Sequence, residues 1–98
     1  MRTPEGYEKD KIKKHLAFIG AWFCLPYMAG FGKSGVPDIL VCYRGAFVSI
    51  EVKREGKKPT VLQQRRMEEI SSAGGYALWG TADKVIAAIE HLRGSYKI

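Results

Sequence analysis

Two runs of strand-forming residues with a two-residue break between them constrain this chain more than any other feature. The runs are Asp38–Tyr43 (DILVCY) and Ala46–Lys53 (AFVSIEVK), and Arg44-Gly45 separates them. This arrangement predicts a β-hairpin in which Tyr43 faces Ala46. Because successive strand residues point to opposite faces, one face of the hairpin is expected to be continuously apolar and to form the core. Its members are Ile39, Val41, Val48, Ile50 and Val52.

The other face of the hairpin carries ionisable residues. In the expected register Asp38 faces Glu51, and directly opposed residues have Cβ atoms about 4.5–5.5 Å apart. Two carboxylates that close repel each other unless a cation lies between them, and a hard divalent cation is the natural candidate. Lys53 follows Glu51 by two residues and points to the same place. A turn at Gly45-Ala46 would instead pair Asp38 with Lys53, and a bulge would shift the pairing by one residue. Alternatively, Glu51 and Lys53 only line a solvent-facing strand.

The segments around the hairpin predict an α/β fold with the order αβββαβα, in which helices flank a small mixed β-sheet. A first helix begins after Thr3 and ends at Gly20, and Pro26 limits the next segment to an edge or irregular strand. Residues 1–98 are expected to form a single domain. The remaining expected elements are a loop over Ala29–Val36, a charged loop over Arg54–Pro59, a helix from Thr60 to Gly74, a strand over Tyr76–Trp79 and a helix capped by Thr81. The apolar face of the second helix is expected to be Leu62, Met67, Ile70 and Ala73.

The charge of the chain favours a polyanionic partner. Lys and Arg number 16 and Asp and Glu number 10, which gives a net charge of +6 and a pI near 9.5. A basic balance in a small domain points to nucleic acid, although it also serves solubility. The residues from Lys53 to Glu68 concentrate this charge, with six basic and two acidic side chains. The two cysteines form no CxxC pair, which argues against a zinc ribbon and fits a reducing cytoplasm.

No signal peptide and no membrane-spanning run is expected, because the N-terminus has no apolar core and no run of about 18 apolar residues occurs.

Two carboxylates that hold Mg²⁺ or Mn²⁺ suit phosphodiester hydrolysis, because the cation polarises a phosphoryl oxygen and lowers the pKa of a bound water. A lysine beside them can stabilise the transition state.

Pro37-Asp38, followed after twelve residues by Glu51-Val52-Lys53, on a hairpin that comes after an N-terminal helix, resembles the PD-(D/E)xK nuclease superfamily. More narrowly, the chain resembles the virus-type replication-repair nuclease (VRR-NUC) domain. The resemblance covers nearly the whole chain and implies a restriction-endonuclease-like fold. The segments that carry it are Thr3–Gly6, Gly32–Leu40, Leu62-Gln63 and Ala73–Gly75.

The resemblance implies a site. Asp38, Glu51 and the carbonyl of Val52 are expected to bind Mg²⁺ or Mn²⁺, and Lys53 is expected to be catalytic. The family also has a first-helix glutamate, which matches Glu5 best, with Glu8 as the alternative on the same helix face. The family glutamine of the next helix matches Gln63. Alternatively, Glu5 only favours the helix dipole and Gln63 only closes a capping box with Thr60, and for Gln63 both roles can hold at once.

Several basic and polar residues are candidate DNA contacts. Alternatively, Arg65 and Arg66 only form a solvated face of their helix. They are Lys33, Ser34, Arg54, Lys57, Lys58, Arg65 and Arg66.

The expected function is that of a metal-dependent DNA endonuclease in the cytoplasm of a bacterial or phage-infected cell, selective for branched DNA such as four-way junctions. The alternative is a non-catalytic nucleic-acid-binding module that reuses the fold. A homodimer is expected, because two related sites are needed for symmetric cleavage of a junction. Aromatic and apolar residues that a small domain does not bury would form the dimer interface, unless they complete the core. They are Trp22, Phe23, Tyr27, Met28 and Phe31.

Overall fold

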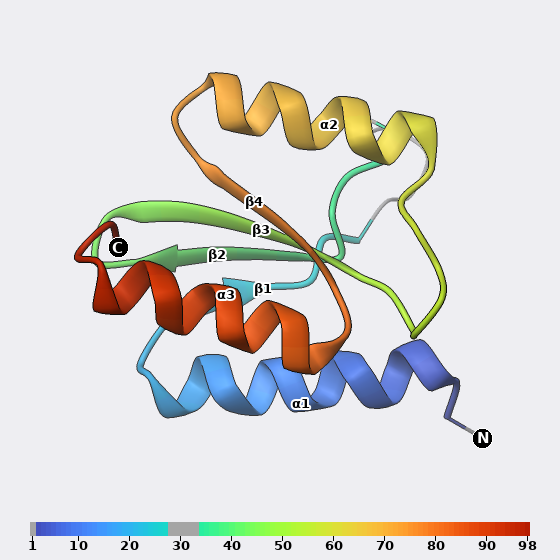
Figure 1. The fold of residues 1–98 in the computed structure, drawn as a ribbon, viewed down its shortest axis with the longest axis horizontal. Helices are drawn as coiled ribbons and strands as arrows, with labels where there is room; N and C mark the ends of the chain where they lie inside the picture. Colours follow the sequence, from blue (N-terminus) through green and yellow to red (C-terminus); the bar gives the residue numbers. More distant parts are fainter. Residues whose placement is uncertain (1, 28–33) are drawn as a thin grey trace.

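A computed structural model of the chain describes residues 2–27 and 34–98, and its helices lie on both faces of a small sheet (Figure 1). Helix α2 covers one face, and helices α1 and α3 lie on the other. This arrangement confirms the expected α/β class and the order αβββαβα. The elements are α1 (Pro4–Phe18), β1 (Trp22–Cys24), β2 (Ile39–Tyr43), β3 (Ala46–Val52), α2 (Val61–Ser72), β4 (Tyr76–Gly80) and α3 (Ala82–Gly94).

Within the described residues, the sheet has the strand order β1-β2-β3-β4 and is mixed. β1 pairs antiparallel with β2 and β2 with β3, whereas β3 and β4 run parallel through the α2 crossover. β1 and β4 are therefore the edge strands of the described sheet. As expected from Pro26, the first strand is short and lies at an edge.

The hairpin has the predicted register. Tyr43 pairs with Ala46 and Ile39 with Ile50. Arg44 and Gly45 both have positive φ, at 50° and 86°, which is the backbone that a two-residue hairpin turn with the right twist requires. The strands are slightly shorter than expected, because Asp38 comes just before β2 and Lys53 just after β3.

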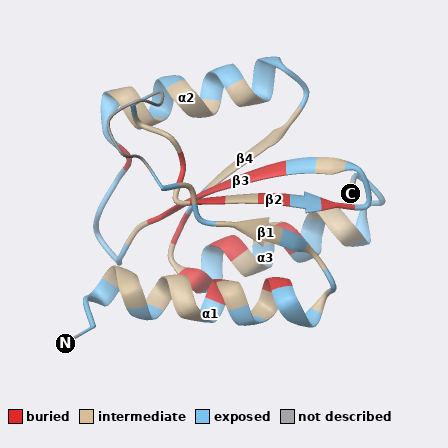
Figure 2. Ribbon diagram, turned by 180° about the vertical axis from the view of Figure 1, so that it is seen from behind, coloured by how far each residue is buried: buried red, intermediate tan, exposed pale blue. Residues whose placement is uncertain are grey.

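The core lies between the sheet and helices α1 and α3. Figure 2 shows buried residues concentrated along β2 and β3 and on the inner sides of these two helices. At 25 cal/mol per Å², each large aliphatic side chain buried there contributes about 1.5–3 kcal/mol to folding. The members are Ile12, Leu16, Ile39, Val41, Tyr43, Val48, Ile50, Val52, Ala82, Val85 and Ile89.

Helix α2 packs less deeply than its sequence pattern predicts. The structure describes all of α2, and none of its side chains is fully buried. Of the expected apolar face, Leu62, Met67 and Ile70 are half-buried and Ala73 is exposed. No helix among residues 2–27 and 34–98 is long and apolar enough to cross a membrane.

Candidate active site

The polar face of the hairpin comes together at the ends of β2 and β3, on the side that α2 covers. Asp38 immediately precedes β2, and the register that pairs Ile39 with Ile50 continues to place Asp38 beside Glu51. Lys53 follows β3 directly, and its Nζ lies 4.0 Å from Glu51 Oε1. The three residues predicted to carry the chemistry are thus neighbours in space.

Asp38 and Val52 are tied through the main chain. The Val52 N–H donates a hydrogen bond to Asp38 Oδ2 at 2.8 Å. One further pair in this register would set Pro37 opposite Val52, and proline has no N–H to donate to the Val52 carbonyl. The N–H and C=O of a strand residue point to the same neighbouring strand, so the Val52 carbonyl also faces Asp38. Pro37 cannot donate the hydrogen bond that this carbonyl would otherwise accept in the sheet. Two oxygen atoms there, one from the Asp38 side chain and one from the Val52 backbone, are therefore candidate ligands.

Glu51 is a buried carboxylate with three polar neighbours, Gln63, Asp38 and Lys53. Only 4% of the residue is exposed, and Gln63 Nε2 donates a hydrogen bond to its Oε1 at 2.6 Å. The pKa of Glu51 is raised from 4.5 to about 7, mainly by burial and then by the charge of Asp38, and the Lys53 ammonium partly opposes both effects. The carboxylate pair is thus short of positive charge even with Lys53 beside it.

Gln63 closes the expected capping box and also forms a hydrogen bond to Glu51. The Thr60 N–H donates to Gln63 Oε1 at 2.8 Å, and the Gln63 N–H donates to Thr60 Oγ1 at 3.1 Å, which completes a capping box at the start of α2. Since the side-chain oxygen accepts from a backbone donor, the amide NH₂ must point the other way, toward Glu51. The helix cap therefore fixes the orientation of a hydrogen bond to the buried carboxylate.

The donor set fits a hard divalent cation. Asp38, Glu51 and the Val52 carbonyl supply oxygen ligands, and a cation would relieve the repulsion between the two carboxylates. Among residues 2–27 and 34–98, no group of three or more His, Cys, Asp or Glu side chains is placed to hold a metal ion. Two carboxylates suffice for Mg²⁺, which keeps several waters and commonly takes one or two carboxylates together with substrate phosphates.

The first-helix glutamates differ in their contacts. Glu8 Oε1 accepts a hydrogen bond from the Ala82 N–H at 2.8 Å and so caps the start of α3. Because the Lys53 N–H bonds to the Gly80 carbonyl at 2.9 Å, this cap lies close to the end of β3. Glu5, one turn earlier, is half-buried and makes no hydrogen bond or ion pair with any other described residue. Neither glutamate forms a hydrogen bond or ion pair with Asp38 or Glu51 in the described structure.

The candidate DNA contacts fall into two groups. Arg54, Lys57 and Lys58 are exposed in the loop between β3 and α2, and Arg65 is exposed on α2. Arg66 is instead engaged within the protein, with Nε on the Ser34 carbonyl at 2.7 Å and an ion pair to Glu69 at 2.9 Å. Ser34 is exposed, and Lys33 lies outside the described residues.

Sequence reasoning missed Trp79, which pairs with Glu51 across the parallel strands β3 and β4. Residues paired in this way share a sheet face, so the indole belongs to the same side of the sheet as the carboxylates. The register of a parallel pair depends on how the crossover helix packs, and no local signal in the sequence reports it.

The fold resembles that of a domain in a solved structure. A solved structure described as a "VRR_NUC domain" matches with a TM-score of 0.77 and 30% sequence identity, over 91% of this chain and 97% of that chain. No protein-family model and no curated protein sequence matches the chain.

Proposed function

Because the chain belongs to the VRR_NUC domain family, a family of nuclease domains, we propose that it is a divalent-metal-dependent DNA endonuclease. The observation that carries this proposal is the grouping of Asp38, Glu51 and Lys53 at the ends of two neighbouring strands, with Glu51 buried. A buried carboxylate with a strongly raised pKa beside a second carboxylate is costly to a fold and is typical of a functional site.

Each residue of the site has a distinct task in the proposed reaction. Asp38, Glu51 and the Val52 carbonyl would hold Mg²⁺ or Mn²⁺, which would polarise the scissile phosphate and favour deprotonation of water. The Lys53 ammonium lies beside Glu51 and stabilises the negative charge that grows on the phosphate. Gln63 is a positioning residue, because it holds the Glu51 carboxylate in one orientation. Glu5 and Glu8 remain candidates for a first-helix contribution.

The proposed substrate is DNA, held by the basic surface next to the site. Arg54, Lys57 and Lys58 directly follow Lys53 in the chain and are exposed. Their charges can neutralise phosphates on either side of the cleaved bond, and the affinity for DNA should then fall steeply with salt. The exposed residues Ser34 and Arg65 extend this proposed surface. Arg66 is engaged with Ser34 and Glu69, and Lys33, outside the described residues, stays a prediction from the sequence.

We further propose that two copies of the chain associate and cut branched DNA, such as a four-way junction, with paired nicks. One copy carries one site and cuts one strand at a time, so symmetric cleavage requires a second site related by a two-fold axis. The large apolar side chains exposed between α1 and β2 supply a candidate interface at the β1 edge. They are Phe18, Trp22, Leu25 and Tyr27, whereas Phe23 packs partly against the core and Met28 and Phe31 lie outside the described residues.

The test is cleavage of end-labelled linear, flapped and four-way DNA by purified protein in Mg²⁺, Mn²⁺ or EDTA. The proposal predicts cleavage that EDTA abolishes, with the branched substrates cut best. Lys53→Met should lose cleavage and keep DNA binding, whereas Lys14→Met, which removes an exposed lysine from α1, should retain both. DNA binding without cleavage in any metal would instead identify a binding module.

A further inference from the structure

A row of three side chains crosses the α2 face of the sheet from the site to the sheet edge. Asp38 lies beside Glu51, and Glu51 pairs with Trp79 on β4. Neighbouring strands are about 4.7–4.9 Å apart, so Trp79 is the next side chain after the carboxylates. Because β4 is an edge strand of the described sheet, the indole is at the margin of the protein, and 39% of the residue is exposed.

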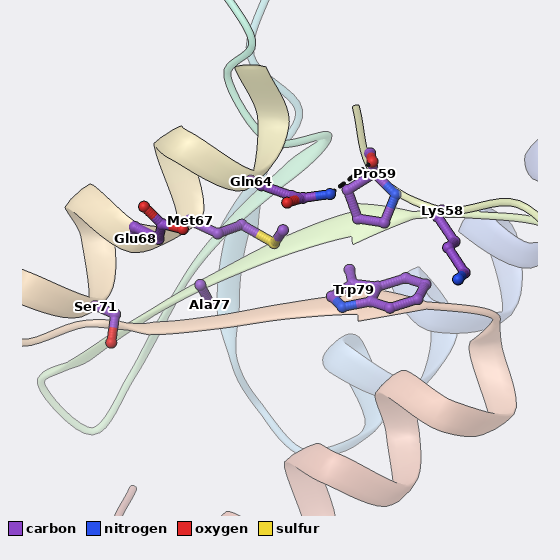
Figure 3. A pocket seen from close by; sticks show the side chains of 8 residues that line it. All are labelled: Lys58, Pro59, Gln64, Met67, Glu68, Ser71, Ala77 and Trp79. Carbon is purple, nitrogen blue, oxygen red and sulfur yellow. Dashed lines mark hydrogen bonds between the residues drawn. The ribbon is translucent and has the colours of Figure 1, made fainter. Parts of the chain in front are cut away.

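A cavity of about 450 Å³ opens between α2 and β4, and Trp79 forms one of its walls (Figure 3). Met67 of α2 points toward the indole, and Pro59 lies at the end of the cavity nearest the ring. Gln64 Nε2 donates to the Pro59 carbonyl at 3.2 Å, which fixes the amide at the rim. The cavity therefore combines a flat aromatic surface, an apolar floor and a few polar groups, as small-molecule sites do.

Basic side chains outnumber acidic ones around the indole, where Glu68 and Glu55 are the acidic residues that line the cavities. Lys84 Nζ lies 5.8 Å from the centroid of the Trp79 ring, and Lys58 lines the same cavity. Arg54 and Lys57 line a smaller adjoining hollow together with Trp79 and Lys84. A ligand on the indole would thus have cations within reach of any phosphate groups that it carries.

From this arrangement we infer that Trp79 is a stacking platform for an unpaired nucleobase of the DNA strand bound at the Asp38–Glu51 site. A nucleobase fits because it is flat, stacks on an aromatic ring whatever its identity, and is joined to phosphates that the lysines attract. A base inside a duplex has both faces covered by its neighbours, so only an unpaired or extruded base can use this platform. The inference rests on the proposed function and adds a reason for selectivity toward DNA with unpaired nucleotides near the cut.

Intrinsic fluorescence tests the platform without altering it. The chain has two tryptophans, so Trp22→Phe leaves Trp79 as the sole indole reporter. In Ca²⁺, we expect a 12-nucleotide single strand to quench Trp79 strongly and saturably, and the blunt duplex of the same sequence to quench it little. Equal quenching by the two DNAs, or none at saturation, would overturn the inference.

Substitution of Trp79 measures the strength of the stacking. Loss of one base–aromatic stack weakens binding by roughly 5- to 150-fold, so Trp79→Leu should bind the single strand that much more weakly. Trp79→Phe keeps a ring and should lose far less. Thermal unfolding of both variants shows whether the fold survives. Equal single-strand affinity for wild type and a folded Trp79→Leu variant would contradict the platform.

These measurements also separate the platform from the nuclease proposal. They record binding rather than cleavage, so a protein that cuts no DNA can still show the single-strand response at Trp79. Conversely, a protein that cleaves DNA in Mg²⁺ but shows neither the quenching nor the Trp79→Leu defect keeps its nuclease function and loses the platform.

Discussion

The two faces of the sheet are built in opposite ways. Toward α1 and α3, β3 presents Val48, Ile50 and Val52, which are almost fully buried in an aliphatic core. Toward α2, the alternate residues Ser49 and Glu51 are just as buried but polar. Because the alternation of one strand separates the two sets, adjacent residues of β3 serve folding on one side and the proposed chemistry on the other.

The α2 face is costly to the fold. Ser49 Oγ is buried and has no hydrogen-bond partner among the described residues, and Glu51 has a pKa raised to about 7. A buried polar group without a partner costs about 1–3 kcal/mol. Burial of the aliphatic face offsets this cost. Substitutions on that face should therefore lower stability, whereas substitutions one residue away on the polar face should lower the proposed activity.

The largest effect is expected at Asp38. Loss of a group that only supports a metal ligand costs about 10–100-fold, so Asp38→Asn, which removes a proposed ligand, should reduce cleavage by more than about 100-fold. Its stability should not fall, because repulsion with Glu51 is relieved. Asp10→Asn, at an ion-paired carboxylate on the outer surface of α1, is the matched control and should cleave normally. Single-turnover cleavage in Mn²⁺ measures both, and full activity of Asp38→Asn would refute the assignment.

The next largest effect is expected from truncating a buried side chain on the aliphatic face. Ile50→Ala leaves a cavity beneath the sheet and should lower the free energy of unfolding by about 2–5 kcal/mol. Ser49→Ala, one residue away, removes an unpaired buried hydroxyl and should be neutral or stabilising. Urea unfolding compares the two. A larger loss for Ser49→Ala than for Ile50→Ala would reverse the assigned roles of the faces.

The pH dependence of stability should reveal the titration of the Glu51 carboxyl group. Its folded pKa of about 7 exceeds its ordinary value of 4.5, so the folded state binds a proton more tightly than the unfolded chain. Stability should therefore be greatest below pH 4.5 for this group and be lost as the pH rises to about 7, by on the order of 3 kcal/mol. Unfolding curves in EDTA measure this slope. It should be absent from Glu51→Gln, and an unchanged slope in that variant would assign the titration to another group.

The smallest effect is expected at the cap of α2. Thr60→Ala should cost about 1 kcal/mol of stability and also reduce cleavage several-fold, because Gln63 is no longer held toward Glu51. Thr81→Ala removes the corresponding cap of α3, which does not involve Gln63. Equal cleavage by the two variants at equal stability would show that the cap does not act through Gln63.

Local patterns predicted much of the molecule. The alternation of β2 and β3 around Arg44-Gly45 gave the register that places Asp38 beside Glu51, because a shift by one residue would turn the apolar face outward. The Thr60–Gln63 spacing likewise predicted the capping box.

Contacts between segments far apart in the chain could not be predicted from the sequence. The alignment of Trp79 with Glu51, and the hydrogen bond that the Ala82 N–H donates to Glu8, arise only when α2 and α3 pack. The shallow burial of α2 was also missed, because helical spacing of apolar residues does not say how deeply a helix sinks.

Titration calorimetry with Mn²⁺ tests most directly whether the polar face holds a metal ion. Wild type and Lys53→Met should bind Mn²⁺ with similar affinity, whereas Glu51→Gln should bind far more weakly, and Ile50→Val on the opposite face should bind like wild type. Mn²⁺ binding by Glu51→Gln with wild-type affinity would contradict the account, because the metal would then lie elsewhere.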